Sequence, residues 1–286
     1  MASSGGNYGP LLNLLIWTLA GASAAFLALR IWAKVRRDRK LWYDDHILVL
    51  AWTFLTAACI LQTVDTTLGF GGPRENVDPS LVDTTRLVST IAGFLLILAT
   101  AWSKTSFALT LLRISTGWPK KIVMFVLVTT NLAIAASGAI QWAHCWPLRK
   151  VWEQSIDGYC WPLRITNGYN IFSSVYSGLM DLTLAALPWV IFRSSDDAAF
   201  LDWAGNKFRR KEMLNISVAM SMAVFAGIAS FVKVFAIYQM NTVNAGPELI
   251  VTLMVLGTAE SAVTIMAVSI PVLRTLEERM PKVVSA

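Results

Sequence analysis

Charged side chains are scarce in this chain. Asp, Glu, Lys and Arg make up 15% of its 286 residues, whereas 55% are hydrophobic and the mean hydropathy is +0.55. A soluble domain usually carries about 25% charged residues, so these charges are too few to cover a surface that faces water. The composition therefore indicates a membrane protein, and the length leaves room for a single domain over residues 1–286.

Histidine and cysteine are also rare, with two and three residues. His46 and His144 are expected on opposite sides of a membrane, so they cannot share a metal ion. No spacing of carboxylates indicates a metal site. The chain also has neither a glycine-rich phosphate loop in context nor a Ser/His/Asp set that its topology could bring together. The sequence thus predicts no metal and no cofactor, and it leaves catalysis undecided.

A basic run is missing at the start of the chain. A cleaved signal peptide begins with such a run, and residues 1–10 have none, so the first apolar run is expected to remain as an anchor. The net charge of +6 comes largely from short linkers at 34–40, 113–121 and 193–211 and from the tail that begins at Arg274. This pattern is typical of membrane topology rather than nucleic-acid binding. Because basic residues mark the cytoplasmic side, the N-terminus is predicted to be lumenal or extracellular and the C-terminus cytosolic.

Seven apolar runs lie between the linkers. A helix needs about 20 apolar residues to cross a bilayer, and each run is long enough. The sequence predicts an all-α, polytopic seven-transmembrane-helix bundle, and both the endoplasmic reticulum and the plasma membrane fit it. The helices are expected at about 11–33, 42–69, 87–112, 121–143, 167–192, 213–240 and 249–273.

Lys104 lies inside the third apolar run, about 13 Å along the helix from Arg113. An unpaired ammonium group at the centre of a membrane helix costs at least about 2.5–3.5 kcal/mol. Two acids at similar depth, Asp181 and Glu260, could neutralise it. We therefore expect the bundle to close around these three residues, which form a candidate intramembrane charge cluster with a possible catalytic role.

Two acids and one lysine would leave one acid without a cation. Such an acid could hold a proton and start an acid-triggered reaction, such as the cyclisation of an epoxide or polyene. The alternative is a structural cluster that fixes helix packing. Asp65 and Lys233 are expected nearer the lumenal side, paired with each other or reaching toward the interface. Asp44 and Asp45 are interpreted as helix-capping acids at the cytosolic edge.

Cys145 and Cys160 fall in the linker between the fourth and fifth predicted helices. Each begins the same five residues, Cys-Trp-Pro-Leu-Arg. This linker is predicted to be lumenal, where disulfides can form, so a Cys145–Cys160 disulfide is expected. Two free thiols under a tryptophan-rich belt are the alternative. Cys59 stands alone in the second predicted helix and is interpreted as buried packing.

Several of these features resemble the fungal rhodopsin-like membrane family. The resemblance covers nearly the whole chain and rests on the seven spans and on the order of its short motifs. The motifs are Tyr43-Asp44-Asp45, Trp102-Ser-Lys104 with Leu112-Arg113, the Cys145/Cys160 linker, Asn170 with Asp181 and Pro188, and Glu260 with Pro271-Val-Leu-Arg274. The family includes membrane proteins of secondary-metabolite clusters, such as the satratoxin-cluster type, and pathogenesis-associated receptors.

Retinal is not expected despite the family name. Known opsins carry the Schiff-base lysine in the last helix, and the predicted helix at 249–273 contains no lysine. Lys104 and Lys233 lie in the third and sixth predicted helices instead.

The leading functional hypothesis is a membrane component of fungal secondary metabolism that holds or converts a lipophilic small molecule among membrane lipids. Trp102 and Asn170 are candidate pocket residues, although ordinary core packing also explains Trp102. Glu260 or Asp181 would act as the acid, and Lys104 would set their charge. A receptor that contacts a G protein through its cytosolic linkers is the first alternative, and a transporter is the second.

Overall fold

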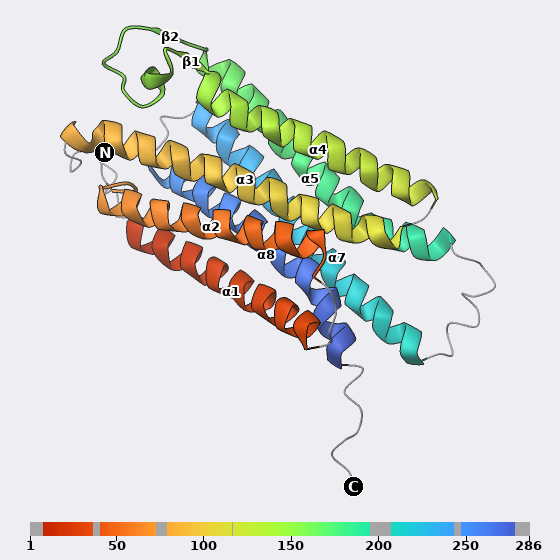
Figure 1. Ribbon diagram of the computed structural model, residues 1–286. Coiled ribbons are helices and arrows are strands. Elements are labelled where there is room, and N and C mark those ends of the chain that lie inside the picture. Colours follow the sequence, from red (N-terminus) through yellow and green to blue (C-terminus); the bar gives the residue numbers. More distant parts are fainter. Residues whose placement is uncertain are drawn as a thin grey trace.

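The computed structural model describes residues 8–36, 41–72, 79–115, 117–194, 207–242 and 247–277. Within them, seven long α-helices form one elongated bundle (Figure 1). The helices are α1 (Gly9–Val35), α2 (Tyr43–Thr67), α3 (Val82–Ile114), α4 (Trp118–Ala143), α5 (Leu163–Ser194), α7 (Lys207–Thr242) and α8 (Pro247–Glu277). Three short elements, η2 (Pro79–Leu81), η3 (Leu148–Val151) and a hairpin of β1 (Cys145–Trp146) and β2 (Tyr159–Cys160), complete the described part. The predicted all-α class is confirmed.

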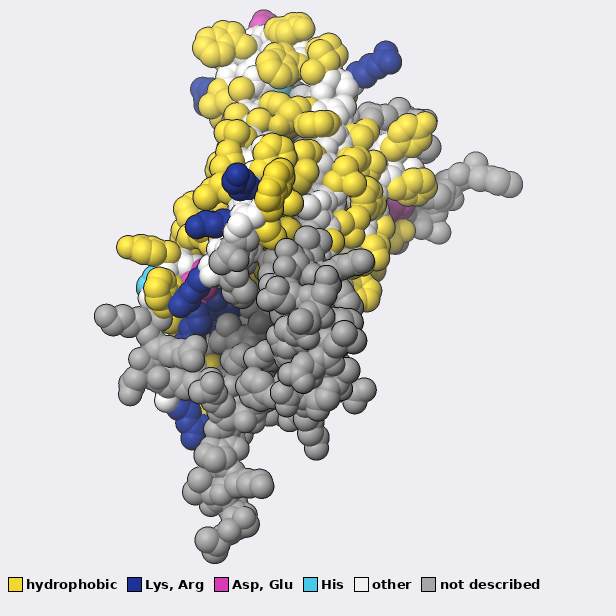
Figure 2. All heavy atoms as spheres, turned by 90° about the vertical axis from the view of Figure 1, so that its right-hand side faces the viewer, with side chains coloured by type: hydrophobic (Ala, Val, Ile, Leu, Met, Phe, Trp, Pro, Cys, Tyr) yellow, Lys and Arg dark blue, Asp and Glu magenta, His cyan; other side chains and the backbone are white. Residues whose placement is uncertain are grey.

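Five of the described helices, α1, α2, α3, α4 and α8, are long and apolar enough to cross a membrane. In α7 the apolar stretch Val224–Met240 is shorter. Large apolar side chains also point outward, with Leu14 62% exposed, Leu132 65% and Phe235 61%. Figure 2 shows hydrophobic side chains over much of the described part of one face. Such a surface suits lipid rather than water, and the chain is an all-α polytopic membrane protein.

Three helices begin four or more residues earlier than the apolar runs predict. The structure starts α3 at Val82 rather than 87, α5 at Leu163 rather than 167, and α7 at Lys207 rather than 213. An apolar run marks only the part of a helix that lies in hydrocarbon. The backbone keeps its helical hydrogen bonds beyond that part, where polar side chains can reach water.

Helix α3 lies at the centre of the bundle and packs against α2, α4 and α8. Helix α1 packs against α2 and α8, and α7 packs between α5 and α8. Glycines bring α5 and α7 together: a Cβ atom built on Gly178 would lie 3.3 Å from the carbonyl oxygen of Gly227. Small residues allow this kind of close contact between membrane helices. The arrangement leaves α3, α5, α7 and α8 facing one another at mid-bundle.

The hairpin between α4 and α5 contains the predicted disulfide. Cys145 and Cys160 are directly opposed in the antiparallel β1–β2 pair and are joined by an S–S bond. Lys150 stabilises the enclosed loop by donating hydrogen bonds to the carbonyl oxygens of Ile156 (3.0 Å) and Gly158 (2.8 Å). We call residues 144–161 the disulfide loop and this end of the bundle the disulfide end. Cys59 is buried and unbonded to another cysteine, as expected.

Removing the disulfide is expected to lower the free energy of unfolding. Closing a loop with a sequence separation of 15 residues stabilises a fold by about 3 kcal/mol in the chain-entropy model. Cys145→Ala/Cys160→Ala should therefore unfold earlier than wild type in denaturant titrations in detergent micelles. A reductant should shift the wild-type transition and leave the double variant unchanged. Equal transitions for both oxidised proteins would contradict the prediction.

Candidate functional site

A cavity of about 900 Å³ lies among α3, α4, α5, α7 and α8 and extends beneath the disulfide loop. This volume lies within the range of small-molecule sites, about 300–1,000 Å³. Loop residues line its outer part, and the side chains of Ser177, Lys233 and Glu260 line its deepest part. The cavity therefore connects the disulfide end with the charged centre of the bundle.

The walls of the cavity differ in polarity. Helix α5 contributes a polar stripe that follows one helix face, since its members are separated by one, three or four residues. The stripe consists of Thr166, Asn167, Asn170, Ser173, Ser174 and Ser177. The facing helices contribute mainly aliphatic side chains, among them Leu96, Ile97, Ile134, Ile237, Leu253 and Met254. A bound molecule would meet polar groups along one side and apolar groups along the others.

Four charged side chains meet at or just beneath the floor of the cavity, which Lys233 and Glu260 line and Lys104 and Asp181 do not. Lys104 Nζ on α3 lies 2.8 Å from Asp181 Oδ2 on α5 and 2.7 Å from Glu260 Oε1 on α8. Lys233 Nζ on α7 lies 2.5 Å from Glu260 Oε2. Ser177 accepts a hydrogen bond from Lys104 and donates one of 3.2 Å to Glu260. We call Lys104, Asp181, Lys233 and Glu260 the floor cluster.

The floor cluster contains Lys104, Asp181 and Glu260, the three residues that the sequence placed at similar depth in the membrane. The expectation that one acid would lack a cation is wrong, because Lys233 pairs with Glu260. Neither alternative given for Lys233 matches the structure, because its ammonium group contacts Glu260 rather than Asp65 or the interface. Asp65 is buried in α2 and accepts a hydrogen bond from Ser89 instead. A catalytic role for the cluster stays a prediction.

Lys233 was placed too near the lumenal side because its depth was taken from its Cα atom. It lies about 13 Å from the end of α7 at Thr242, and Glu260 lies about 20 Å from the start of α8 at Pro247. The flexible four-carbon stem of lysine spans the difference in height. The sequence did carry a signal for the contact with Glu260, because Lys233 is a second lysine within the membrane and could neutralise the second acid.

The two candidate pocket residues lie in different places. Asn170 lines the cavity as part of the polar stripe on α5. Trp102 points toward α2, where its ring centroid lies 6.4 Å from that of Phe54, and it does not line the cavity. The arrangement of Trp102 matches the core-packing alternative.

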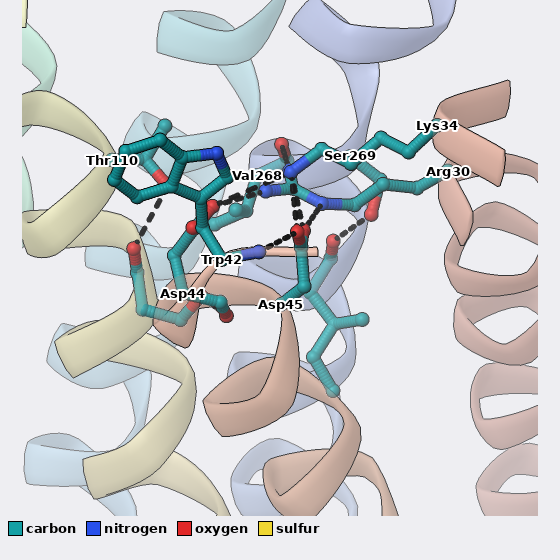
Figure 3. A network of polar contacts seen from close by, with 10 residues as sticks. Arg30, Lys34, Trp42, Asp44, Asp45, Thr110, Val268 and Ser269 are labelled. Atoms are coloured by element: carbon teal, nitrogen blue, oxygen red, sulfur yellow. Dashed lines mark hydrogen bonds and ion pairs between the residues drawn. The ribbon is translucent and has the colours of Figure 1, made fainter. Parts of the chain in front are cut away.

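A second ion-pair network, at the opposite end of the bundle, was missed. Arg30 of α1 donates hydrogen bonds to Asp45 Oδ1 (2.9 Å) and Asp44 Oδ2 (2.8 Å) at the start of α2 and to the carbonyl oxygen of Val268 in α8. Lys34 Nζ lies 2.6 Å from Asp45 Oδ2. Figure 3 shows these side chains converging between the helices. We call Arg30, Lys34, Asp44 and Asp45 the lower network.

The lower network also reaches α3 and includes the expected helix cap. Ser106 donates a 2.7 Å hydrogen bond to the backbone carbonyl of Asp44. The Asp45 carboxylate accepts the Trp42 backbone N–H at 3.1 Å, which confirms its capping role. The sequence signal was present: Arg30 and Lys34 are four residues apart on one helix face and precede two adjacent acids. It was overlooked because Lys34 was assigned to the basic linker at 34–40 and Arg30 was given no partner.

No group of three or more His, Cys, Asp and Glu side chains in the described ranges could hold a metal ion. The floor cluster alternates cations and anions, and lysine ammonium groups cannot act as ligands. The side chains of the floor cluster can form hydrogen bonds and ion pairs.

The bundle, its lipid-facing surface and its internal cavity define a polytopic membrane protein of the seven-helix class. The family model described as the fungal rhodopsin domain matches residues 29–279. The chain belongs to this family, which confirms the resemblance seen in its motifs. No curated protein and no solved structure matches the chain.

Proposed function

We propose that this protein is a membrane component of fungal secondary metabolism that holds a lipophilic intermediate in the cavity. The observation that carries the proposal is the cavity itself, about 900 Å³ in volume, with aliphatic walls, a polar stripe on α5 and a charged floor. Membrane lipid surrounds the bundle and could deliver such a molecule. The place in secondary metabolism rests on the resemblance to the membrane proteins of metabolite clusters.

Holding the molecule is favoured over converting it by acid catalysis. Acid-triggered cyclisation would need a carboxylic acid that keeps its proton, and an acid next to a cation stays ionised. Glu260 contacts two lysines and Asp181 contacts one. Lys104 and Lys233 therefore support a role for both carboxylates in positioning rather than in proton donation.

A receptor is the second candidate function, and one observation favours it. Helix α3 carries Lys104 of the floor cluster and, two residues later, Ser106, which contacts the lower network. A ligand that shifts α3 at the cavity floor would also act on the opposite end, where a G protein could bind. Of the two linkers expected to contact it, 113–121 and 193–211, residues 116 and 195–206 lie outside the described residues. Nothing in the part of the chain that the structure describes favours a transporter.

A metabolite comparison in the native fungus tests the proposal. A clean deletion strain would be complemented with wild type, with Glu260→Gln, or with Ser174→Trp. Ser174 lines the cavity about one helical turn from Ser177, so a tryptophan there should take up part of the space without removing a charge. We expect one lipophilic product to disappear on deletion and wild type alone to restore it.

The two variants separate the possible outcomes. If Ser174→Trp restores the product fully while present in the membrane at wild-type amounts, the cavity does not hold the intermediate and the proposal is wrong. If metabolites are unchanged on deletion and only a response to an external cue is lost, the receptor candidate replaces it. The absence of retinal stays a prediction, which a visible absorption band on adding retinal would overturn.

A further inference from the structure

Lys233 is the charged group of the floor cluster that is most accessible from the cavity. Its side chain is 20% exposed, whereas that of Glu260 is 2% exposed and that of Lys104 is 4% exposed. An ammonium group has three N–H donors, and Glu260 accepts one of them. A molecule at the cavity floor would thus meet at least one N–H donor of Lys233.

The floor cluster is already balanced in charge. It contains two cations, Lys104 and Lys233, and two anions, Asp181 and Glu260, all within ion-pair distance of a partner. A bound carboxylate would leave an uncompensated negative charge in the membrane, and a bound ammonium group an uncompensated positive one. Removing an unpaired charge from water is costly, so the balance disfavours both kinds of ion.

The other lysine of the cavity does not change this balance at the floor. Lys150 lines the outer part but donates its hydrogen bonds to two carbonyl oxygens of the disulfide loop. Polar residues outside α5 also line the cavity, namely Thr100, Ser137, Gln141, His144 and Gln154. The α5 stripe itself carries hydroxyl and amide groups, which are uncharged and can donate hydrogen bonds. They suit oxygen atoms placed along one edge of a molecule.

We infer that the molecule held in the cavity is uncharged and oxygen-bearing. It accepts a hydrogen bond from Lys233 through a carbonyl or similar oxygen, presents further oxygens to α5, and places its hydrocarbon part against α3, α7 and α8. This inference rests on the proposed function, because it names the chemical class of the molecule that the cavity would hold.

Matched probes test the inference in purified protein reconstituted in lipid nanodiscs. The probes are 2-acetylnaphthalene, 2-naphthoate and 2-naphthylmethylammonium, which share a ring system and differ in charge at neutral pH. Saturation-transfer NMR would give the affinity of each one. Ser174→Trp serves as the control with a partly filled cavity, so signal that weakens in it comes from the cavity rather than from partition into lipid. We expect wild type to bind the ketone about tenfold more tightly than either ion.

Charge variants of the floor cluster should change this preference in opposite directions. Glu260→Gln leaves an excess positive charge and should raise binding of naphthoate relative to the ketone about tenfold. Lys233→Gln leaves an excess negative charge and should do the same for the ammonium probe. The double variant Lys233→Gln/Glu260→Gln is balanced in charge again and should bind the ketone more tightly than either ionic probe. It also guards against misfolding, because it buries no unpaired charge.

Two kinds of failure can be told apart. If wild type prefers an ionic probe, or if the order of affinities is the same in all four proteins, the inference about ligand charge is wrong and the cavity remains a binding site. If no probe gives a signal that Ser174→Trp weakens, the cavity binds none of them and both proposals fall.

Discussion

Replacing Lys104 with methionine is expected to lower the free energy of unfolding by about 3–5 kcal/mol, as is typical when one partner of a buried ion pair is removed. Lys104 is 3% exposed and contacts both Asp181 and Glu260. Methionine keeps an unbranched side chain of similar length, so packing changes little. Glu260 would keep Lys233, but Asp181 would be left as a buried carboxylate without a cation.

The size of this effect depends on charge balance, which a second substitution can restore. Lys104→Met/Asp181→Asn removes one cation and one anion and leaves the Lys233–Glu260 pair. The double variant should therefore recover most of the stability lost in Lys104→Met. Lys120→Met, which removes an exposed lysine of α4, should change stability by no more than about 0.5 kcal/mol.

Denaturant titration in detergent micelles measures all three variants against wild type. A Lys104→Met transition equal to that of Lys120→Met would show that the buried lysine does not stabilise the bundle. A double variant less stable than Lys104→Met would show that charge balance is not what the pairing provides.

The contacts of Lys104 with Asp181 and Glu260 could be predicted because a bilayer defines the depth of each residue along the membrane normal. Counting residues along each apolar run gives the height of a side chain in the membrane, and charges at equal height must find one another. This reasoning gives neither the rotation of a helix about its axis nor the reach of a long side chain. The contact of Lys233 with Glu260 was therefore missed, and the sequence could not decide between the cavity and core packing for Trp102.

The bundle itself was predictable for the same physical reason. Backbone groups in hydrocarbon must be satisfied within a helix, so the long apolar runs could be read as helices. The cavity could not be predicted in this way, because its volume arises where the side chains of five helices and the disulfide loop fail to fill the space between them. Its polar stripe on α5 is visible in the sequence only after the structure shows which face points inward.

Replacing Arg30 of the lower network is expected to cause the second large loss of stability. This side chain is 1% exposed and links α1 to α2 and α8 through Asp44, Asp45 and the Val268 carbonyl oxygen. In Arg30→Leu, Lys34 would face both acids alone, and the Val268 carbonyl would lose a donor. A loss of about 3–5 kcal/mol in the free energy of unfolding is expected, as for other broken buried ion pairs.

The conservative variant shows whether the geometry of Arg30 matters beyond its charge. Arginine presents several N–H donors in a planar fork, whereas a lysine ammonium group is a compact point charge. Arg30→Lys keeps the charge but cannot reach three acceptors that lie on two different helices. It should therefore lose about 1–3 kcal/mol, the usual effect of leaving a buried hydrogen-bonding group unsatisfied, and so lie between wild type and Arg30→Leu.

Arg149→Leu is the matched control, because it removes an arginine whose side chain is 73% exposed in the disulfide loop. Denaturant titrations in the same micelles should place the order of stability as wild type and Arg149→Leu, then Arg30→Lys, then Arg30→Leu. If Arg30→Lys equals wild type, charge alone explains the network and its three directed bonds contribute nothing. If Arg30→Leu equals Arg149→Leu, the desolvation of four charged groups cancels their attraction, and apolar packing holds α1, α2 and α8 together at this end.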